Sequence, residues 1–260
     1  MDLVTRLITR KINMIRFLLI LFITLNIVSC KKAADRSCLK ATGKIISKTI
    51  SPGSFNKLFL MEHIEYVLVQ DSISFVQLEG GENLLGFIDC TISSGELTIQ
   101  NKNKCKFLRY KNGKIKAEVH FTQLTDIIFQ GTGQLTNKKS WTFNYLNIVL
   151  KDTGGSMNLS GFHGAYLNLV NTHGWGDITM NGSVNYFRAD MDGNGFFDSR
   201  NFLVKDSVSI TSVSSTISKL NASNCLLKAQ LTGSGDVWYY GIPMKIEKQE
   251  IGTGRLVDKN

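Results

Sequence analysis

Residues 165–182 of this chain run AYLNLVNTHGWGDITMNG, and residues 226–241 run LLKAQLTGSGDVWYYG. Both segments contain a strand-like run, a turn with two glycines, a second strand-like run and a polar corner. Similar glycine pairs recur along the chain, with leading glycines 19 to 23 residues apart and one gap of 40. The pairs are Gly131/Gly133, Gly154/Gly155, Gly174/Gly176, Gly193/Gly195, Gly233/Gly235 and Gly252/Gly254. A fixed period of this length indicates structural units that stack on one another.

The gap of 40 corresponds to two periods with a degenerate turn near residues 213–215. A single unit cannot bury its own apolar face, so aligned positions must stack into a shared core. We expect Ile178 to align with Val237, and Leu167 with Leu227. Glycine is expected at the turns because a tight reversal requires a positive φ and because neighbouring coils approach closely. The sequence therefore predicts an all-β, right-handed β-helix or β-solenoid-like stack with about 20 residues in each coil.

Residues 45–100 also alternate apolar and polar side chains with the period of a strand. Residues 88–99 predict a hairpin, because two β-branched runs flank Gly95. No segment after the first thirty residues shows the 3.6-residue apolar period of an amphipathic helix. We expect one domain over residues 45–258, with N-terminal strands at 45–116 and repeat coils at 117–258.

Residues 1–29 have the features of a lipoprotein signal peptide. Basic residues precede a short apolar run at 17–27, which is too short to cross a bilayer core of ~30 Å. The run leads into Ile-Val-Ser-Cys at 27–30, which resembles a bacterial lipobox and predicts cleavage before Cys30 and acylation of its thiol, for example with palmitate. Met14 is an alternative start, and a buried N-terminal helix is the alternative to a signal peptide.

Several acyl chains would anchor the protein without a transmembrane helix. Lys31 stands where an aspartate would favour inner-membrane retention, so we expect an outer-membrane lipid anchor, on the periplasmic face or the cell surface. Residues 30–44 are polar and basic and are expected to be a tether. Without residues 1–29, which carry four basic residues and one acidic residue, the net charge falls from +9 to +6.

Nucleic acid is not an expected partner. The lysine-rich segment 102–116 contains only two aromatic side chains, whereas nucleic-acid binding favours aromatic side chains interleaved with a basic face. A solvated loop or edge strand explains this segment, and a weak attraction to anionic glycans or lipid phosphates is the alternative.

Four cysteines remain when Cys30 is assigned to lipid, and they allow three disulfide pairings. Cys90 and Cys105 flank a predicted hairpin and are the favoured pair. No CxxC or Cys/His spacing indicates a metal site, and we expect no cofactor.

A family resemblance follows from several short segments. These are FNKL at 55–58, LEGGENLL at 78–85, GELTI at 95–99, GSGDV at 233–237 and YGIP at 240–243. Together with the glycine turns, they resemble the head GIN domain of auto-transporter adhesins over about residues 45–258. The resemblance implies a β-helix-like stack in a lipoprotein or secreted protein of a Gram-negative bacterium, with a function inferred from architecture. The chain departs from the family pattern at residues 153–156, 173–176 and 213–215.

One segment resembles half of a calcium-binding loop. Its candidate ligands are Asp190, Asp192, Asn194 and Asp198; the first three stand at alternate positions and Gly195 follows, as in the first half of an EF-hand loop. The twelfth position holds Asn201 where a bidentate glutamate is expected, and no helices flank the loop. The coil period also accounts for the glycines without calcium.

Aspartates and tryptophans near the turns are candidate ligand-facing residues. Asp177 and Asp236 each follow a turn glycine, and Asp198 lies between them in the repeat. A row of carboxylates could cleave polysaccharide, but aspartate at such positions more often caps a turn by accepting backbone N–H groups. Trp175 and Trp238 are candidates for the surface, where aromatic side chains favour binding, and packing over the neighbouring coil is the alternative for Trp175.

The histidines lack metal-ligand spacing, and no serine lies in a Gly-x-Ser-x-Gly elbow. We therefore expect a non-catalytic, adhesin-like lipoprotein of the outer envelope, with a glycan or protein ligand and an undetermined oligomeric state. The alternatives are a glycan-active enzyme that uses the edge aspartates, and a purely structural envelope component.

Overall fold

The structure, a computed structural model, describes residues 41–104 and 114–260. Thr42–Asn260 is one compact unit, which is almost entirely β-structure. Its elements are β1 (Ile45–Ile50), β2 (Lys57–Leu60), β3 (Glu65–Gln70), β4 (Phe75–Gly81), α2 (Glu82–Leu85), β5 (Ile88–Ser93), β6 (Glu96–Asn101), β7 (Lys116–Phe121), β8 (Asp126–Phe129), β9 (Gln134–Asn137), β10 (Trp141–Lys151), β11 (Ser156–Thr172), β12 (Ile178–Met191), β13 (Phe197–Ser212), β14 (Ser218–Asn221), β15 (Leu226–Leu231), β16 (Val237–Tyr240), β17 (Lys245–Glu250) and β18 (Leu256–Asp258).

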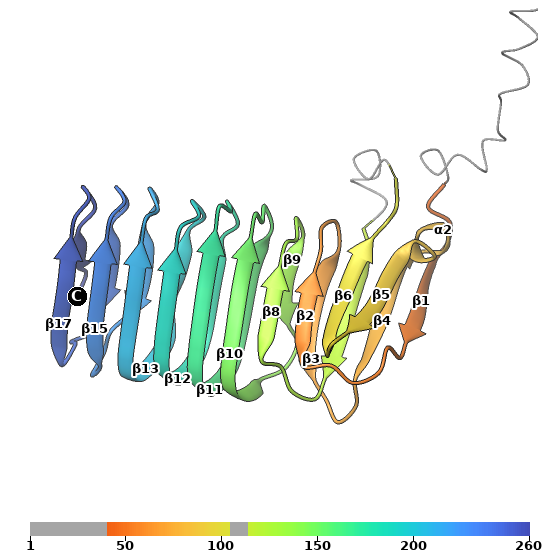
Figure 1. The fold of residues 1–260 in the computed structure, drawn as a ribbon, viewed down its shortest axis with the longest axis horizontal. Helices are drawn as coiled ribbons and strands as arrows, with labels where there is room; N and C mark the ends of the chain where they lie inside the picture. Colours follow the sequence, from red (N-terminus) through yellow and green to blue (C-terminus); the bar gives the residue numbers. More distant parts are fainter. Residues whose placement is uncertain (1–40, 105–113) are drawn as a thin grey trace, which may run out of the picture. The chain divides into compact units, whose positions relative to one another are not determined.

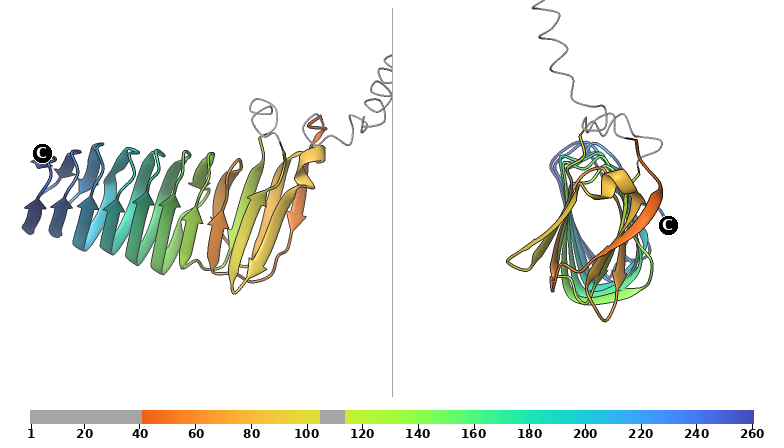
Figure 2. Two further views of the ribbon diagram at one scale, coloured as in Figure 1. Left: turned by 45° about the horizontal axis from the view of Figure 1, so that its top comes forward. Right: turned by 90° about the vertical axis from the view of Figure 1, so that its right-hand side faces the viewer.

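The strands stack in parallel register into a β-solenoid of about six turns. Corresponding strands of successive coils lie side by side, from β8 through β10, β11, β12, β13 and β15 to β17 (Figure 1). Seen along the stack, the compact unit is a flattened tube with a strand layer on each broad side (Figure 2). The all-β solenoid predicted from the glycine period is therefore confirmed.

The core consists of inward-facing rows that run along the stack. Leu167, Phe187, Val208 and Leu227 occupy one register position in successive coils, and each is at most 2% exposed. A second row joins Ile178 to Val237 through Phe197 and Ser218. This register confirms both predicted alignments. Within each row, the side chains pack on the row members of the coils above and below.

The turn glycines are required by close packing and not by a positive φ. A Cβ atom on Gly155 would lie 2.0 Å from the carbonyl oxygen of Gly133, and one on Gly176 would lie 1.7 Å from that of Gly155. None of these three glycines has a positive φ; in the turns, Asp152 and His173 have φ values of 49° and 54° instead. The prediction of close approach is confirmed, but the positive φ was wrong for these glycines, because Asp152 and His173, earlier in the same turns, carry that conformation.

The turn without a glycine pair lies where the period predicts it, between β13 and β14. The Thr216 hydroxyl donates to the carbonyl oxygen of Gly195 at 2.9 Å, and a Cβ on Gly235 would lie 2.1 Å from the carbonyl oxygen of Thr216. Residues 213–216 therefore form the coil turn between these two glycine pairs.

The stack begins before the repeat coils expected from residue 117. β2 lies between β6 and β8, and β3 lies between β7 and β9, all in parallel register. The β2–β3 coil is thus inserted between two coils that follow it in the sequence. The glycine period does not reveal this arrangement, because residues 71–95 leave the stack to form β4, α2 and β5.

Antiparallel strands close the N-terminal end of the solenoid. β4 pairs with β1 and β7, and β5 pairs with β6. The predicted hairpin is confirmed, with Ser94 and Gly95 at φ values of 50° and 78° in its turn. The short helix α2 was not predicted, because one helical turn is too short to show a period. Its Leu84 and Leu85 are 1% and 2% exposed and pack against the core.

No helix in residues 41–104 or 114–260 is long and apolar enough to cross a bilayer. Cys30 and the signal peptide at 1–29 lie outside the described residues, as does most of the tether at 30–44. The lipid anchor therefore stays a prediction.

Candidate functional site

Trp175 lies in the turn between β11 and β12, and 73% of the residue is exposed. Its backbone N–H donates to the carbonyl oxygen of Thr153 in the preceding coil at 2.9 Å. The neighbouring residues, Gly174 and Gly176, have no side chains to cover it. The indole therefore projects from the turn edge of the solenoid while its backbone is fixed.

A cavity of about 620 Å³ lies beside Trp175. Its lining comes from the β2–β3 turn at 63–65, the end of β6, the segment before β7, and the coil turns at 132–134, 154–156 and 175–177. We call this cavity the turn-edge groove. Nothing lies within 4 Å of the position of a Cβ atom on Gly154, so this glycine leaves space in the groove and is not required by packing.

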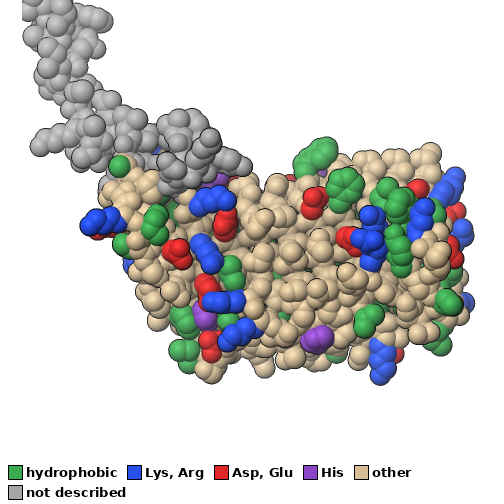
Figure 3. Space-filling view, turned by 180° about the vertical axis from the view of Figure 1, so that it is seen from behind, with side chains coloured by type: hydrophobic (Ala, Val, Ile, Leu, Met, Phe, Trp, Pro, Cys, Tyr) green, Lys and Arg blue, Asp and Glu red, His purple; other side chains and the backbone are tan. Residues whose placement is uncertain are grey.

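The turns that form the groove lie along the upper edge of the solenoid in Figure 1, beyond the arrowheads of β8 and β10. The outline of the same edge dips beside hydrophobic side chains in Figure 3. Charged side chains gather toward the two ends of the face seen in Figure 3, and its middle is mostly uncharged. The groove is therefore a local feature of one edge.

The groove is lined mainly by polar groups. Glu65 and Lys114 form an ion pair at 2.7 Å, and the hydroxyl of Thr132 accepts a hydrogen bond from the backbone N–H of His63 at 3.2 Å. Asp177 contributes a carboxylate next to Trp175. An aromatic face beside hydrogen-bonding groups is an arrangement that can hold and orient a polar ligand.

Asp177 and Asp236 both cap the next coil. Oδ1 of Asp177 accepts from the backbone N–H of Phe196 at 3.1 Å, and Oδ1 of Asp236 accepts from that of Arg255 at 2.9 Å. The two aspartates occupy equivalent positions three coils apart, which is about 14 Å at the spacing of neighbouring strands. A catalytic carboxylate pair spans about 5–9.5 Å, so these two residues do not form one.

Asp198 lies on β13 and forms a bidentate pair with Arg200, whose Nη2 is 2.8 Å from Oδ2. Burial alone would raise the pKa of Asp198, but the hydrogen bonds and charge of Arg200 outweigh it and hold that pKa below its usual value. A general acid requires a raised pKa. The predicted row of catalytic aspartates is therefore not assembled, and the geometry does not favour the glycan-active enzyme.

The indole ring of Trp238 on β16 is less accessible to a ligand than expected for a surface aromatic residue. The Nζ atoms of Lys259 and Lys219 lie 4.2 Å and 5.6 Å from its ring centroid. Cation–π contacts of this kind occupy the ring faces that a ligand would need. Of the two predicted tryptophans, Trp175 is the one that the structure leaves open.

The four calcium candidates are engaged elsewhere. Asp190 pairs with Arg188 at 3.0 Å, and Asp192 lies 3.7 Å from Nε2 of His173. The side chain of Asn194 accepts hydrogen bonds from Ser215, and Asp198 binds arginine as described above. Within residues 41–104 and 114–260, no group of three or more His, Cys, Asp or Glu residues is arranged to hold a metal ion. The structure therefore gives the calcium hypothesis no support.

Cys90 lies half-buried on β5, and burial raises the pKa of its thiol to about 11. Cys105, its predicted partner, lies outside the described residues. The disulfide between Cys90 and Cys105 stays a prediction.

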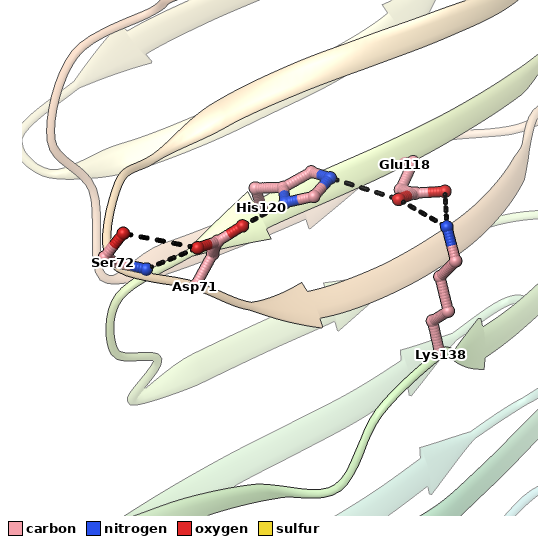
Figure 4. A network of polar contacts seen from close by, with 5 residues as sticks. All are labelled: Asp71, Ser72, Glu118, His120 and Lys138. Carbon is pink, nitrogen blue, oxygen red and sulfur yellow. Dashed lines mark hydrogen bonds and ion pairs between the residues drawn. The ribbon is translucent and has the colours of Figure 1, made fainter.

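A polar network on the N-terminal coils was not predicted (Figure 4). His120 on β7 is 8% exposed, and its Nδ1 and Nε2 lie 3.0 Å from Asp71 and 3.1 Å from Glu118. Lys138, after β9, binds Glu118 at 3.1 Å, and Phe75 stacks on the imidazole with ring centroids 3.8 Å apart. The network joins strands that are distant in sequence, so no local motif could have revealed it.

The pKa values of both carboxyl groups in this network are lowered. The backbone N–H of Ser72 and the side chain of His120 lower that of Asp71. Burial alone would raise the pKa of Glu118, but Lys138 and His120 outweigh it. Because each carboxylate is stabilised by its partners, the network is a structural clamp that contributes to folding at neutral pH.

Residues 54–243 match the family model described as putative auto-transporter adhesin, head GIN domain. The chain belongs to this family, as its short segments and glycine turns predicted. Membership in an adhesin-like family indicates a protein of the cell envelope or surface. Among curated proteins, none matches the chain.

Several crystal structures share the fold. A putative adhesin from Bacteroides fragilis has 19% identity and a TM-score of 0.74, and the match covers 83% of this chain and 97% of that protein. A putative adhesin from Parabacteroides distasonis has 18% identity and a TM-score of 0.63, with 84% and 98% covered. A putative lipid binding protein from Parabacteroides distasonis has 18% identity and a TM-score of 0.57, with 83% and 97% covered. None of the three is described as an enzyme, and at these identities the likeness shows the fold alone.

Proposed function

We propose that this protein is a non-catalytic, adhesin-like binding module that is anchored to the outer membrane through acylated Cys30 and binds its ligand in the turn-edge groove. The observation that carries the proposal is the exposed indole of Trp175 on the wall of that groove. Exposed aromatic side chains on rigid scaffolds are common anchors of binding sites.

The solenoid supports this function mechanically. Backbone hydrogen bonds join each coil to the next, so the turns that build the groove are fixed relative to one another. A rigid site loses little conformational entropy when it binds, which favours many weak contacts at a surface. Family membership adds the adhesin-like class, while the anchor rests on the lipobox at 27–30.

The anchor is tested by fractionating cells that produce the wild-type protein or the Cys30→Ala variant. We expect the wild type in the outer-membrane fraction and the variant outside it. Outer-membrane recovery of both proteins to the same extent would contradict lipid anchoring. A C-terminal epitope and external protease then distinguish the faces of that membrane: digestion on intact cells is expected, and complete protection would contradict a role in adhesion to external surfaces.

Binding is tested by adherence of cells that carry the wild-type, Trp175→Ala or Trp238→Ala protein, with equal amounts confirmed by immunoblot. We expect Trp175→Ala to reduce adherence and Trp238→Ala to leave it unchanged, because Trp238 lies away from the groove between two lysines. Equal adherence of all three strains and of a strain without the protein would overturn the proposed function.

A further inference from the structure

We propose that the ligand of the turn-edge groove is a neutral sugar, held as a terminal or internal pyranose unit of a glycan; this inference rests on the proposed function. It follows from three properties of the groove: how its backbone is used, which side chains line it, and how its charges are distributed. The cavity of about 620 Å³ lies within the range of about 300–1,000 Å³ that is typical of small-ligand sites.

Two described coil turns of the groove already use backbone N–H groups in hydrogen bonds between coils. The N–H of Gly155 donates to the carbonyl oxygen of Gly131 at 3.1 Å, and that of Trp175 donates to Thr153 at 2.9 Å. These bonds run between successive coils and occupy the groups that β-strand addition would require. At these two turns, side chains are therefore the groups open to a ligand.

The side chains suit a molecule rich in hydroxyl groups. Gln134 and Ser156 line the groove, and in the described part of the chain neither side chain has a hydrogen-bond partner. An amide and a hydroxyl both donate and accept, as a sugar hydroxyl does. Trp175 supplies a flat apolar surface on which the C–H face of a pyranose ring can lie.

The charges in the described part of the groove favour a neutral ligand over an anionic one. Lys114 is paired with Glu65, so its charge is already compensated. Asp177 adds a carboxylate; its Oδ1 accepts from Phe196, and its other oxygen can accept a sugar hydroxyl. A sulfated, phosphorylated or sialylated group placed beside Asp177 would meet a like charge.

The experiment measures binding of the purified full-length lipoprotein in detergent to immobilised glycans. The neutral arm holds glucose-, galactose- and mannose-based oligosaccharides, and the anionic arm holds sialylated and sulfated ones. We expect binding in the neutral arm, an affinity loss of about tenfold or more in Trp175→Ala, and wild-type affinity in Trp238→Ala.

A second variant tests the cavity itself. Gly154→Trp places a bulky side chain where a Cβ has open space, so it fills the groove without a clash at that atom. We expect Gly154→Trp to abolish glycan binding while its thermal unfolding stays close to that of the wild type. Unchanged affinity in a folded Gly154→Trp protein would overturn the placement of the ligand.

Two outcomes separate this inference from the proposed function. Binding confined to the anionic arm, or Trp175-dependent cell adherence with no glycan bound, overturns the neutral-sugar inference while the binding module stands. Cell adherence that does not depend on the protein overturns the proposed function itself.

Discussion

The coils from β10 onward repeat one geometry, whereas the coils built from β2, β3 and β6–β9 differ from one another. In the later coils, each turn packs directly on the previous one, so the backbone leaves little freedom. The earlier coils contain an excursion of the chain, the polar network of His120 and most of the turn-edge groove. Regular stacking therefore supplies rigidity, and the groove forms where the irregular coils meet the regular turns that carry Gly154 and Trp175.

The ends of the stack differ in the same way. The N-terminal end is covered by antiparallel strands and by the buried leucines of α2. At the other end, β17 pairs only with β15 within the described residues. Its Lys248 and Glu250 align with Ala229 and Leu231, which face the core, and they pair with each other at 3.2 Å. Charges at the core-facing register positions of an end strand protect it from pairing with another chain.

The largest loss of stability is expected when a methyl group is added to a glycine in a turn of the later coils. Gly176→Ala places Cβ 1.7 Å from the carbonyl oxygen of Gly155, so neighbouring coils must separate. We expect the free energy of unfolding to fall by about 4 kcal/mol or more in urea titrations. The matched control, Gly154→Ala, should change it by at most about 0.5 kcal/mol, because its Cβ has open space. Equal losses would show that the two turn positions are not packed differently.

Shortening one side chain to alanine should destabilise the two ends of the core unequally. Leu84→Ala removes a side chain that is 1% exposed and should cost about 2–5 kcal/mol of unfolding free energy. Ile246→Ala, on β17, removes a side chain that is 40% exposed and should cost less than about 1 kcal/mol. Both values come from chemical denaturation, and a larger loss for Ile246→Ala would reverse the comparison.

Removing the charges of β17 should change assembly more than folding. We expect the double substitution Lys248→Ile and Glu250→Val to raise the oligomeric state above that of the wild type, because an apolar edge strand is a template for pairing. Light scattering coupled to size-exclusion chromatography measures the mass. Lys245→Gln and Glu247→Gln, at outward positions of the same strand, provide the control, and an unchanged mass in the first variant would contradict edge protection.

The smallest effect expected is the pH-dependent contribution of Glu118, in the N-terminal coils, to stability. The pKa of Glu118 is lowered in the folded state, so its contribution to stability is present above the unfolded pKa of about 4.3 and is lost as the pH falls through the folded pKa. We expect Glu118→Gln to reduce the free energy of unfolding by roughly 0.5–1 kcal/mol at pH 7, and this difference should shrink below pH 4–5. Denaturation at several pH values measures it. A difference that grows toward acid pH would contradict the clamp.

The sequence predicted the later coils better than the earlier ones. Glycine spacing was sufficient to align Leu167 with Leu227 and to predict a degenerate turn near 213–215, within the turn observed at 213–216, because identical coils place identical demands on each position. The order of β6, β2 and β8 could not be predicted, since it depends on where the excursion through β4 and β5 returns to the stack.

The candidate site was predicted in part. The exposure of Trp175 followed from its place in a glycine turn, and the capping role of Asp177 followed from its place after one. The groove did not follow from the sequence, because its depth depends on Gly154 and on the nearby β2–β3 turn. Trp238 shows the limit of reasoning by residue type, since the lysines near its ring come from the coils on either side of β16.

The central claim is that the ligand contacts Trp175 in the turn-edge groove, and the chain contains only three tryptophans with which to test it. The direct measurement is an NMR titration of their indole N–H signals with a neutral oligosaccharide that binds in the glycan panel, with each signal assigned by substitution. The account predicts that the Trp175 signal shifts with saturation, while those of Trp141 in the core and Trp238 between its lysines stay in place. A saturable shift of Trp238 with Trp175 unchanged would contradict it.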